Sequence, residues 1–242
     1  MLISKRSIEE AMDENVLFEK IFIQLGLRGE WEKRLRKYAG VRSIPYVQVP
    51  KEKLEKLSKK HQGVVVLAQL VEYASLENII NEVFAQGKNP FLLMLDRISD
   101  VRNFGALARS ALILGVDAII IGSKNQAVIN ADAVKTSAGA LLKIAVCRTH
   151  SLVSTLDFLH QLGISSMATD LSTKDYIYDL DLTEPLVIIL GEEHQGIHPK
   201  LISMAHHRVK IPQIGDLDSL NVSVAGGIVC YEIMKQRLNQ IN

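Results

Sequence analysis

The stretch FLLMLDRISDVRNFGALARSALILGVDAIII, residues 91–121, decides the fold of this chain. It opens with the apolar run FLLML at 91–95 and closes with the apolar run VDAIII at 116–121. Between them the spacing of apolar residues predicts a helix that begins at about Asn103. The inward-facing stripe of this helix is expected to consist of Phe104, Leu107, Ala108, Ala111 and Leu112. Both expected strands are apolar at nearly every position, and a helix joins them. This arrangement is typical of a parallel sheet covered on both faces.

Four further apolar runs continue this alternation of strands and helices toward the end of the chain. They are LLKIAV at 141–146, ISSMA at 164–168, LVIIL at 186–190 and RVKI at 208–211. The pattern predicts the α/β class, with a parallel sheet and helices on both of its sides. Ligands bind at the carboxyl ends of the strands in such sheets, so the turns that follow these runs are where chemistry is expected.

The first 70 residues show a separate and smaller alternation of helices and strands. Strands are expected at VLFEKIFIQ (16–24), IPYVQV (44–49) and within GVVVLAQL (63–70), and helices are expected around 7–15, 31–37 and 51–60. We therefore predict a small α/β domain over residues 1–70. Residues 71–90 resemble a short amphipathic helix that ends near Gly87 and Pro90, which suits a connector. Residues 91–242 form the larger predicted domain.

The composition fits a globular protein. The chain has 242 residues, of which 48% are hydrophobic and 23% are charged, and this balance argues against disorder and against fibrous repeats. No apolar stretch reaches the roughly 20 residues that a bilayer requires, and the first residues lack the apolar core of a signal peptide. We expect a cytoplasmic protein with no membrane partner. Cys147 and Cys230 are expected to be buried thiols rather than a disulfide, because nothing marks an oxidising compartment.

Charge is unevenly distributed along the chain. Residues 1–62 hold 14 lysines and arginines against 9 acidic residues, whereas the remainder holds 14 against 18. The runs WEKRLRK at 31–37 and KEKLEKLSKK at 51–60 carry most of the excess positive charge. Such helices are either solvated surface or a face that binds a polyanion, and the pattern alone does not choose between them.

Polar residues gather in the turns that follow the first and fifth apolar runs of the larger domain. Arg109 lies off the centre of its helix stripe, where a planar guanidinium could bind a phosphate or carboxylate or could simply be exposed. In the turn GEEHQGI at 191–197, two glycines let a ligand approach the backbone, and Glu193 could orient a hydroxyl or pair with Arg109. His194 and the three histidines that follow it lack the spacing of a metal site, so no metal is expected.

A third turn, IPQIGDLDSLNVSVAGG at 211–227, leads into the last helix. Here Ser219 is predicted to cap the helix, with Asn221 in its first turn. The residues Ala225, Gly226 and Gly227 indicate close helix packing, either within the sheet or across a subunit interface. Neither GxGxxG after the first strand nor GxxxxGK[ST] is present, which disfavours an ordinary dehydrogenase, P-loop enzyme or Rossmann-type methyltransferase.

Three motifs in this order resemble those of the SpoU/TrmH family of RNA 2′-O-ribose methyltransferases, within the SPOUT superfamily. They are NFGALAR at 103–109, LGEEHQGI at 190–197, and IP at 211–212 followed by SLNVSVA at 219–225. The resemblance extends over about residues 61–242 and includes VKTSAGAL at 134–141. The basic N-terminal part, which ends in HQGVVV at 61–66, resembles the ribosomal-protein-like RNA-binding domain of the branch that methylates a guanosine of 23S rRNA.

This resemblance implies a trefoil knot near the end of the catalytic domain, a homodimer, and S-adenosyl-L-methionine bound in the loops of the knot. It places Arg109 in catalysis, either as general base or as an anchor for the RNA phosphate, since a guanidinium normally stays protonated. The other implied catalytic residues are Asn103, Glu193, Ser219 and Asn221. The implied cofactor-binding residues are Thr169, Leu190, Gly191, Gly196, Ile211 and Leu220.

Three functions are weighed on this basis. The leading hypothesis is methyl transfer to a ribose 2′-hydroxyl of RNA, with 23S rRNA ahead of tRNA as the substrate. A non-catalytic RNA-binding or ribosome-assembly factor would need neither Arg109 nor the glycines of the 191–197 turn. A small-molecule enzyme with an ordinary nucleotide-binding fold is disfavoured by the missing glycine signature.

Overall fold

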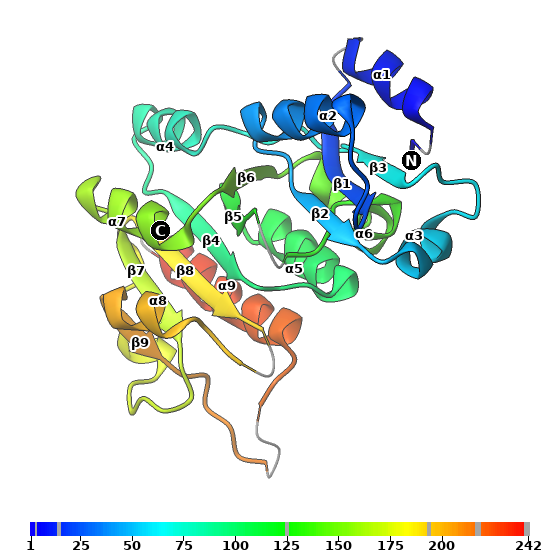
Figure 1. The fold of residues 1–242 in the computed structure, drawn as a ribbon. Helices are drawn as coiled ribbons and strands as arrows, with labels where there is room; N and C mark the ends of the chain where they lie inside the picture. The colour runs from blue at the N-terminus through cyan, green and yellow to red at the C-terminus, as the bar shows by residue number, and fades with distance from the viewer. Residues whose placement is uncertain (3, 14–15, 124–125, 193–194, 216–218, 240–242) are drawn as a thin grey trace. The chain divides into compact units, whose positions relative to one another are not determined.

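The computed structural model describes residues 1–2, 4–13, 16–123, 126–192, 195–215 and 219–239. The chain divides into two compact units (Figure 1). The first unit holds Met1–Leu70 together with Val128–Ala131, and the second begins at Val71 and holds the remainder.

The first unit is a small α/β fold built on a three-stranded sheet of order β2-β1-β3. Its elements are α1 (Lys5–Asp13), β1 (Phe18–Gln24), α2 (Glu30–Val41), β2 (Tyr46–Val49), α3 (Lys51–Leu57) and β3 (Val64–Ala68). β2 runs parallel to β1, and β3 runs antiparallel to it. Helices α1 and α2 cover one face of the sheet, and Leu54 of α3 packs against the other face. The separate α/β unit expected from the sequence is thereby confirmed.

The second unit is built on a six-stranded sheet of order β6-β5-β4-β8-β7-β9, in which every neighbouring pair is parallel. Its strands are β4 (Phe91–Asp96), β5 (Ala118–Gly122), β6 (Ala145–Thr149), β7 (Ser165–Thr169), β8 (Leu186–Gly191) and β9 (His207–Val209). Its helices are α4 (Leu76–Ala85), α5 (Val101–Ile113), α6 (Ala131–Thr136), α7 (Leu152–Gln161), α8 (Pro199–Met204) and α9 (Val222–Asn239), with short 3-10 helices η1 (Ala140–Leu142) and η2 (Ile177–Asp179). The predicted parallel sheet is confirmed.

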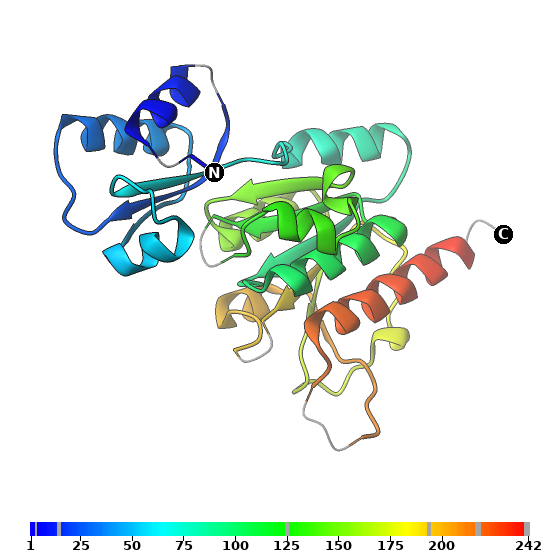
Figure 2. The same cartoon turned by 90° about the vertical axis from the view of Figure 1, so that its right-hand side faces the viewer.

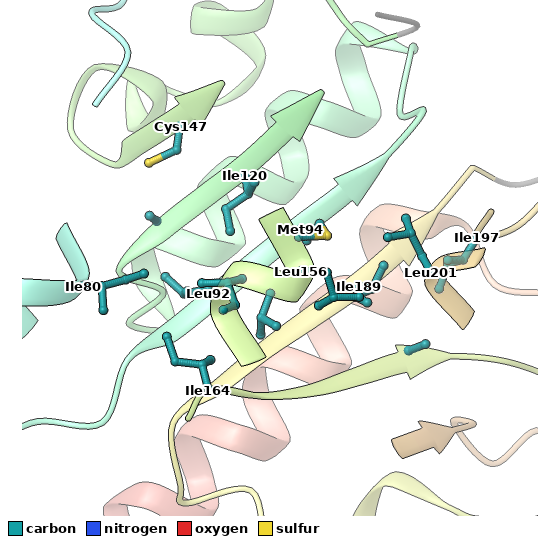
Figure 3. Packing of buried hydrophobic residues seen from close by; sticks show 14 residues of the cluster. Ile80, Leu92, Met94, Ile120, Cys147, Leu156, Ile164, Ile189, Ile197 and Leu201 are labelled. Carbon is teal, nitrogen blue, oxygen red and sulfur yellow. The ribbon is translucent and has the colours of Figure 1, made fainter. Parts of the chain in front are cut away.

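Helices cover both faces of this sheet. On one face, side chains of the central strands form a core with α4, α7 and α8, as Figure 3 shows for Leu92, Met94, Ile120, Ile189 and their neighbours. On the other face α5 and α9 pack side by side (Figure 2). The two central strands β4 and β8 are therefore buried on both sides, which explains why FLLML and LVIIL show no polar alternation.

Several strands are shorter than the predicted runs, and the third run of the larger domain differs most. LLKIAV at 141–146 enters β6 only at Ala145, because Gly139 adopts a φ of 82° and η1 follows it directly. Ala140 and Leu141 are nevertheless buried. Apolar content alone does not distinguish a buried turn from a buried strand, so the prediction was wrong for residues 141–144.

Both cysteines are buried and unpaired, as predicted. Burial raises the pKa of the Cys147 thiol to about 11 and that of the Cys230 thiol to about 12. Among the described residues, no helix combines the length and the apolar character that crossing a bilayer would require. The trefoil knot implied by the family resemblance stays a prediction.

Candidate active site

A pocket of about 400 Å³ lies at the carboxyl ends of the strands in the second unit. Its walls come from the ends of β7, β8 and β9, from the segment that leads into α9, and from the first turn of α9 itself. All six residues predicted to bind a cofactor line it: Thr169, Leu190, Gly191, Gly196, Ile211 and Leu220. Ser219, predicted as catalytic, lines it as well. The structure thus brings together residues separated by up to 51 positions in the sequence.

The turn after β8 closes tightly on itself at one side of the pocket. The backbone N–H of Gly196 donates to the carbonyl of Glu192 over 3.0 Å, and Gly196 has a φ of 63°. A Cβ at Gly191 would lie well under 3.0 Å from the backbone of Gly196 and Ile197. Only glycine fits at position 191, and its bare backbone faces the pocket as a result.

Asp96 and Arg97, at the end of β4, hold this turn in place. Asp96 is only 6% exposed, and its carboxylate accepts a 2.7 Å hydrogen bond from the backbone N–H of His198. The guanidinium of Arg97 donates to the Gln195 side chain over 2.7 Å and to the Gly196 carbonyl over 3.0 Å. Sequence reasoning missed both residues. A charged pair directly after the apolar run at 91–95 was the available signal.

Asn221, rather than Ser219, caps α9. The Asn221 side-chain oxygen accepts a 2.9 Å hydrogen bond from the backbone N–H of Ser223, and the Asn221 carbonyl accepts from the N–H of Ala225. The prediction of Ser219 as the cap was wrong because helix α9 begins only at Val222. The Asn221 amide also donates to the Asn103 side chain over 3.0 Å, which ties α9 to the first turn of α5. Two of the residues predicted as catalytic are therefore in direct contact.

The start of α5 is shaped by Asp100. Its carboxylate accepts hydrogen bonds from the backbone N–H groups of Arg102 and Asn103, over 2.9 and 2.8 Å. This cap makes α5 begin at Val101, two residues before the predicted start.

Helices α5 and α9 approach each other closely behind the pocket. A Cβ at Gly226 would lie 2.8 Å from a methyl group of Leu190, which is a pocket residue, and closer still to Leu107 of α5. A small residue at this position of α9 is therefore needed for helix packing within the unit. This is one of the two explanations that the sequence offered. A Cβ at Gly227 would make only ordinary van der Waals contact, 3.7 Å from the Ser110 hydroxyl oxygen.

Arg109 is exposed on α5, on the opposite side of the helix from its buried stripe. It does not line the pocket, and within the described part of the chain its guanidinium forms no hydrogen bond or ion pair. A guanidinium in this state is available to a phosphate from outside the protomer. Glu193, predicted to act beside it, lies outside the described residues, as does His194.

Three acidic or basic side chains in the pocket wall were not predicted. Asp170 follows β7, Glu192 follows β8, and Lys210 follows β9. Asp170 and Glu192 come two residues after the apolar runs 164–168 and 186–190, so the end-of-strand rule could have found them, whereas Lys210 lies inside the predicted run 208–211. Their charges give the pocket two carboxylates and one ammonium group.

No metal site is found among the residues that the structure describes, which contain no group of three possible metal-ligating side chains. Two of the histidines noted in the sequence have other roles. His198 caps α8 by accepting from the Lys200 N–H, and His206 packs against His160, with 4.1 Å between ring centroids.

The first unit carries the basic residues expected from its sequence, and ion pairs neutralise part of the charge. Arg36 pairs with Glu32 over 2.7 Å, and Glu32 also accepts a hydrogen bond from the Tyr46 hydroxyl. Four lysines on α3 and just after it form no ion pair with any described residue: Lys53, Lys56, Lys59 and Lys60. This part of the surface is positively charged.

Comparison with known proteins places both units. Residues 90–231 match the SpoU rRNA methylase family, and residues 5–74 match the substrate-binding segment of RNA 2′-O ribose methyltransferases. YacO of Bacillus subtilis, assigned to the TrmH family of tRNA/rRNA methyltransferases, is 30% identical over 233 residues, covering 95% of this chain and 92% of YacO.

Two solved structures illustrate the likeness in fold. The AdoMet-bound rRNA methyltransferase of Sinorhizobium meliloti superposes with a TM-score of 0.63 at 21% identity, covering 97% of this chain and 86% of that one. The TrmH/SpoU tRNA modifying enzyme of A. aeolicus gives a TM-score of 0.57 at 26% identity, over 68% of this chain and 85% of that one. With the motifs at 103–109, 190–197 and 211–225 in place, this chain belongs to the SpoU/TrmH family of RNA methyltransferases.

Proposed function

We propose that this protein transfers a methyl group from S-adenosylmethionine to a ribose 2′-hydroxyl of RNA, with a guanosine of 23S rRNA as its target. The observation that carries the proposal is the pocket at the strand ends. It is lined by all six residues that the family resemblance assigns to the cofactor, and its turn excludes any side chain at Gly191.

The walls of the pocket suit the chemistry of this cofactor. A volume of about 400 Å³ lies in the range of small-molecule sites, and apolar side chains of Leu190, Ile211 and Leu220 would enclose the adenine. Within the described part of the chain, the backbones of Ile211 and Leu220 form no hydrogen bond, so both are available to a polar ligand. When bound, the cofactor supplies an electrophilic methyl group on a positively charged sulfur.

Charged side chains in the wall complement the remaining groups of the cofactor. The carboxylates of Asp170 and Glu192 would face positive charge, and the ammonium of Lys210 would face a carboxylate. These residues bind and orient, which is the larger part of what a displacement at a methyl group requires.

Arg109, Asn103 and Asn221 would act on the RNA. The hydrogen bond between Asn221 and Asn103 holds the starts of α9 and α5 together. It lies next in sequence to Ser219 and Leu220, which line the pocket. The exposed guanidinium of Arg109 would bind the phosphate next to the target ribose and hold the 2′-hydroxyl in position. Glu193 belongs to the same proposal through its place in the motif.

A homodimer is proposed from the outer face of α9. Val224, Ile228, Tyr231 and Leu238 are between 38% and 54% exposed, and their spacing places them in one stripe along the helix. An apolar stripe of this length on an exposed helix is suited to an isologous contact with a second copy. Equilibrium sedimentation of Ile228→Glu should yield a monomer, whereas Leu142→Glu, at a residue 60% exposed outside the stripe, should leave the dimer intact.

We propose that residues 1–70 bind RNA, that residues 71–90 connect the two domains, and that residues 91–242 bind the cofactor. The protein is proposed to act in the cytoplasm. Four lysines on α3 and just after it, which form no ion pair with any described residue, support the first role, because phosphate neutralisation gives salt-dependent RNA affinity. A target in rRNA is favoured because the rRNA methyltransferase of Sinorhizobium meliloti matches 97% of this chain, whereas the tRNA modifying enzyme of A. aeolicus matches 68%. Deleting residues 1–70 should remove most RNA affinity and its salt dependence while cofactor binding persists.

The experiment that tests the function is single-turnover transfer of labelled methyl from S-adenosylmethionine to total RNA, followed by mapping of the labelled nucleotide. We expect the label in 23S rRNA. Label confined to tRNA would correct the substrate, and label in neither RNA would contradict the activity.

A further inference from the structure

Two tyrosines and a lysine form an ordered row on the second unit. The rings of Tyr176 and Tyr178 stack with 5.3 Å between centroids and an interplanar angle of 13°. The ammonium group of Lys210 lies 5.0 Å from the centre of the Tyr176 ring. Tyr176, Tyr178 and Lys210 are called the tyrosine row below.

Backbone pairing holds the tyrosine row at the edge of the sheet. The Lys210 N–H donates to the Asp175 carbonyl over 2.9 Å, and the Ile177 N–H donates to the Lys210 carbonyl over 3.2 Å. Ile177, between the two tyrosines, is 3% exposed and anchors the segment in the core. The two rings are therefore presented on an ordered segment and not on a loose one.

The tyrosine row adjoins the cofactor pocket. Lys210 belongs both to the row and to the pocket wall, where it follows β9 directly. Asp170 and Leu171, which start the segment that leads to the tyrosines, line the same pocket. A ligand that occupies the row would be next to a ligand that occupies the pocket.

The outer member of the row is accessible. Tyr178 is 54% exposed although its ring is already aligned by stacking on Tyr176. Arg208, on β9, is also exposed, and its guanidinium lies 3.8 Å from the Asp170 carboxylate. Lys174 precedes the row in the sequence. Asp175 and Asp179 are the acidic residues nearest in sequence, so the surroundings are mixed in charge and the aromatic surface is the distinguishing feature.

We infer that the tyrosine row is a stacking platform for an unpaired base of the RNA substrate, next to the nucleotide whose ribose enters the active site. This rests on the proposed function and adds to it a contact made by the catalytic unit itself. Aromatic rings bind unstacked bases in single-stranded RNA, and a nearby cation favours the adjoining phosphate. Tyr178 would contact the base. Tyr176, with Lys210 next to its own ring, would keep the Tyr178 ring in place.

The test compares the affinity of the full chain for two probes by fluorescence anisotropy. One probe is a labelled single-stranded RNA of mixed sequence, and the other is the same ribose-phosphate chain without bases. Tyr178→Leu removes the ring but keeps apolar bulk, and Tyr178→Phe keeps the ring. Phe84→Leu is the matched control, because it removes another exposed ring of the second unit, on α4.

We expect Tyr178→Leu to bind the base-bearing RNA about 10-fold more weakly, which is within the effect of losing one base–aromatic stack. Its affinity for the abasic chain should be unchanged, and Tyr178→Phe and Phe84→Leu should bind both probes as the natural chain does. Equal affinity of Tyr178→Leu and the natural chain for the base-bearing RNA would overturn the inference. An equal loss for both probes, or a change in oligomeric state on sedimentation, would overturn it too.

Cofactor affinity separates this inference from the proposed function. Tyr178→Leu should bind S-adenosylmethionine as the natural chain does, since Tyr178 does not line the pocket. If the natural chain binds the cofactor and methylates RNA while Tyr178→Leu does so with unchanged KM for RNA, the platform is wrong and the function stands. If no methyl transfer occurs at all, the function fails independently of the probe measurements.

Discussion

Gly191→Ala should disable the cofactor pocket, because the added Cβ has no space. It would overlap the backbone of Gly196 and Ile197 at well under 3.0 Å, and no flexible side chain is present to move aside. Restoring ordinary contact at about 3.5 Å requires the backbone of Gly196 and Ile197 to shift by about 1.3 Å. Overpacking of this kind typically costs 1–3 kcal/mol, and a clash with backbone belongs at about 3 kcal/mol. The thermal midpoint should then fall by about 6–12 °C for a chain of this size.

The same shift should weaken S-adenosylmethionine binding by about 100-fold, which corresponds to about 2.7 kcal/mol. Isothermal titration calorimetry measures this loss, and differential scanning calorimetry measures the midpoint. Gly215→Ala is the control, because a Cβ at Gly215 meets nothing within 4 Å. Its affinity should stay within about 2-fold and its midpoint within about 2 °C. The account of the turn would be refuted if Gly191→Ala bound S-adenosylmethionine as tightly as the natural chain does. It would also be refuted if both variants lost the same cofactor affinity.

Three further predictions follow from side chains outside the turn. Arg109→Ala should reduce methyl transfer by at least about 100-fold while the cofactor Kd stays within a few-fold, measured by single-turnover kinetics and calorimetry; most of the activity remaining at saturating RNA would contradict this role. The free energy of unfolding should fall as the pH drops below 6.5, because burial and the adjacent His206 lower the pKa of His160 and the unfolded chain takes up the proton first. Urea titrations across this pH range should show a smaller fall in the free energy of unfolding for His160→Gln than for the natural chain. An identical dependence of this free energy on pH in both proteins would be the contrary result. Cys147 and Cys230 should not react with a thiol reagent in the native chain at pH 8, because burial raises both pKa values, and both should react in guanidinium; rapid native labelling would show that a thiol is accessible.

The parallel sheet was predictable because its central strands are buried on both faces, and such strands are apolar without interruption. The order of the strands was not, since β4 is hydrogen-bonded to β8 across about 90 residues of intervening chain. Nothing local in either strand encodes that choice. Packing of α5 and α9 on the same face depends on Gly226, whose need for a small residue appears only once its neighbours are known.

The candidate site was predictable where a residue's type reflects a local constraint. Gly191 and Gly196 stand out because a tight turn needs bare backbone, and the family resemblance supplied Thr169, Leu190, Ile211 and Leu220. Asp96 and Arg97 were missed because they support the turn from another strand, and their partners are about 100 residues away. The capping role of Asn221 was assigned to Ser219, since both residue types are good caps and only the backbone decides where the helix starts.

The measurement that tests the central claim most directly is the chemical position of the transferred methyl group. RNA labelled by this protein with radioactive methyl would be hydrolysed in alkali, where cleavage needs a free 2′-hydroxyl at each nucleotide. A methyl on the ribose 2′-oxygen blocks that cleavage, so the account predicts that the label appears in an alkali-resistant dinucleotide. Label in mononucleotides would show that the methyl is on a base and would contradict the account.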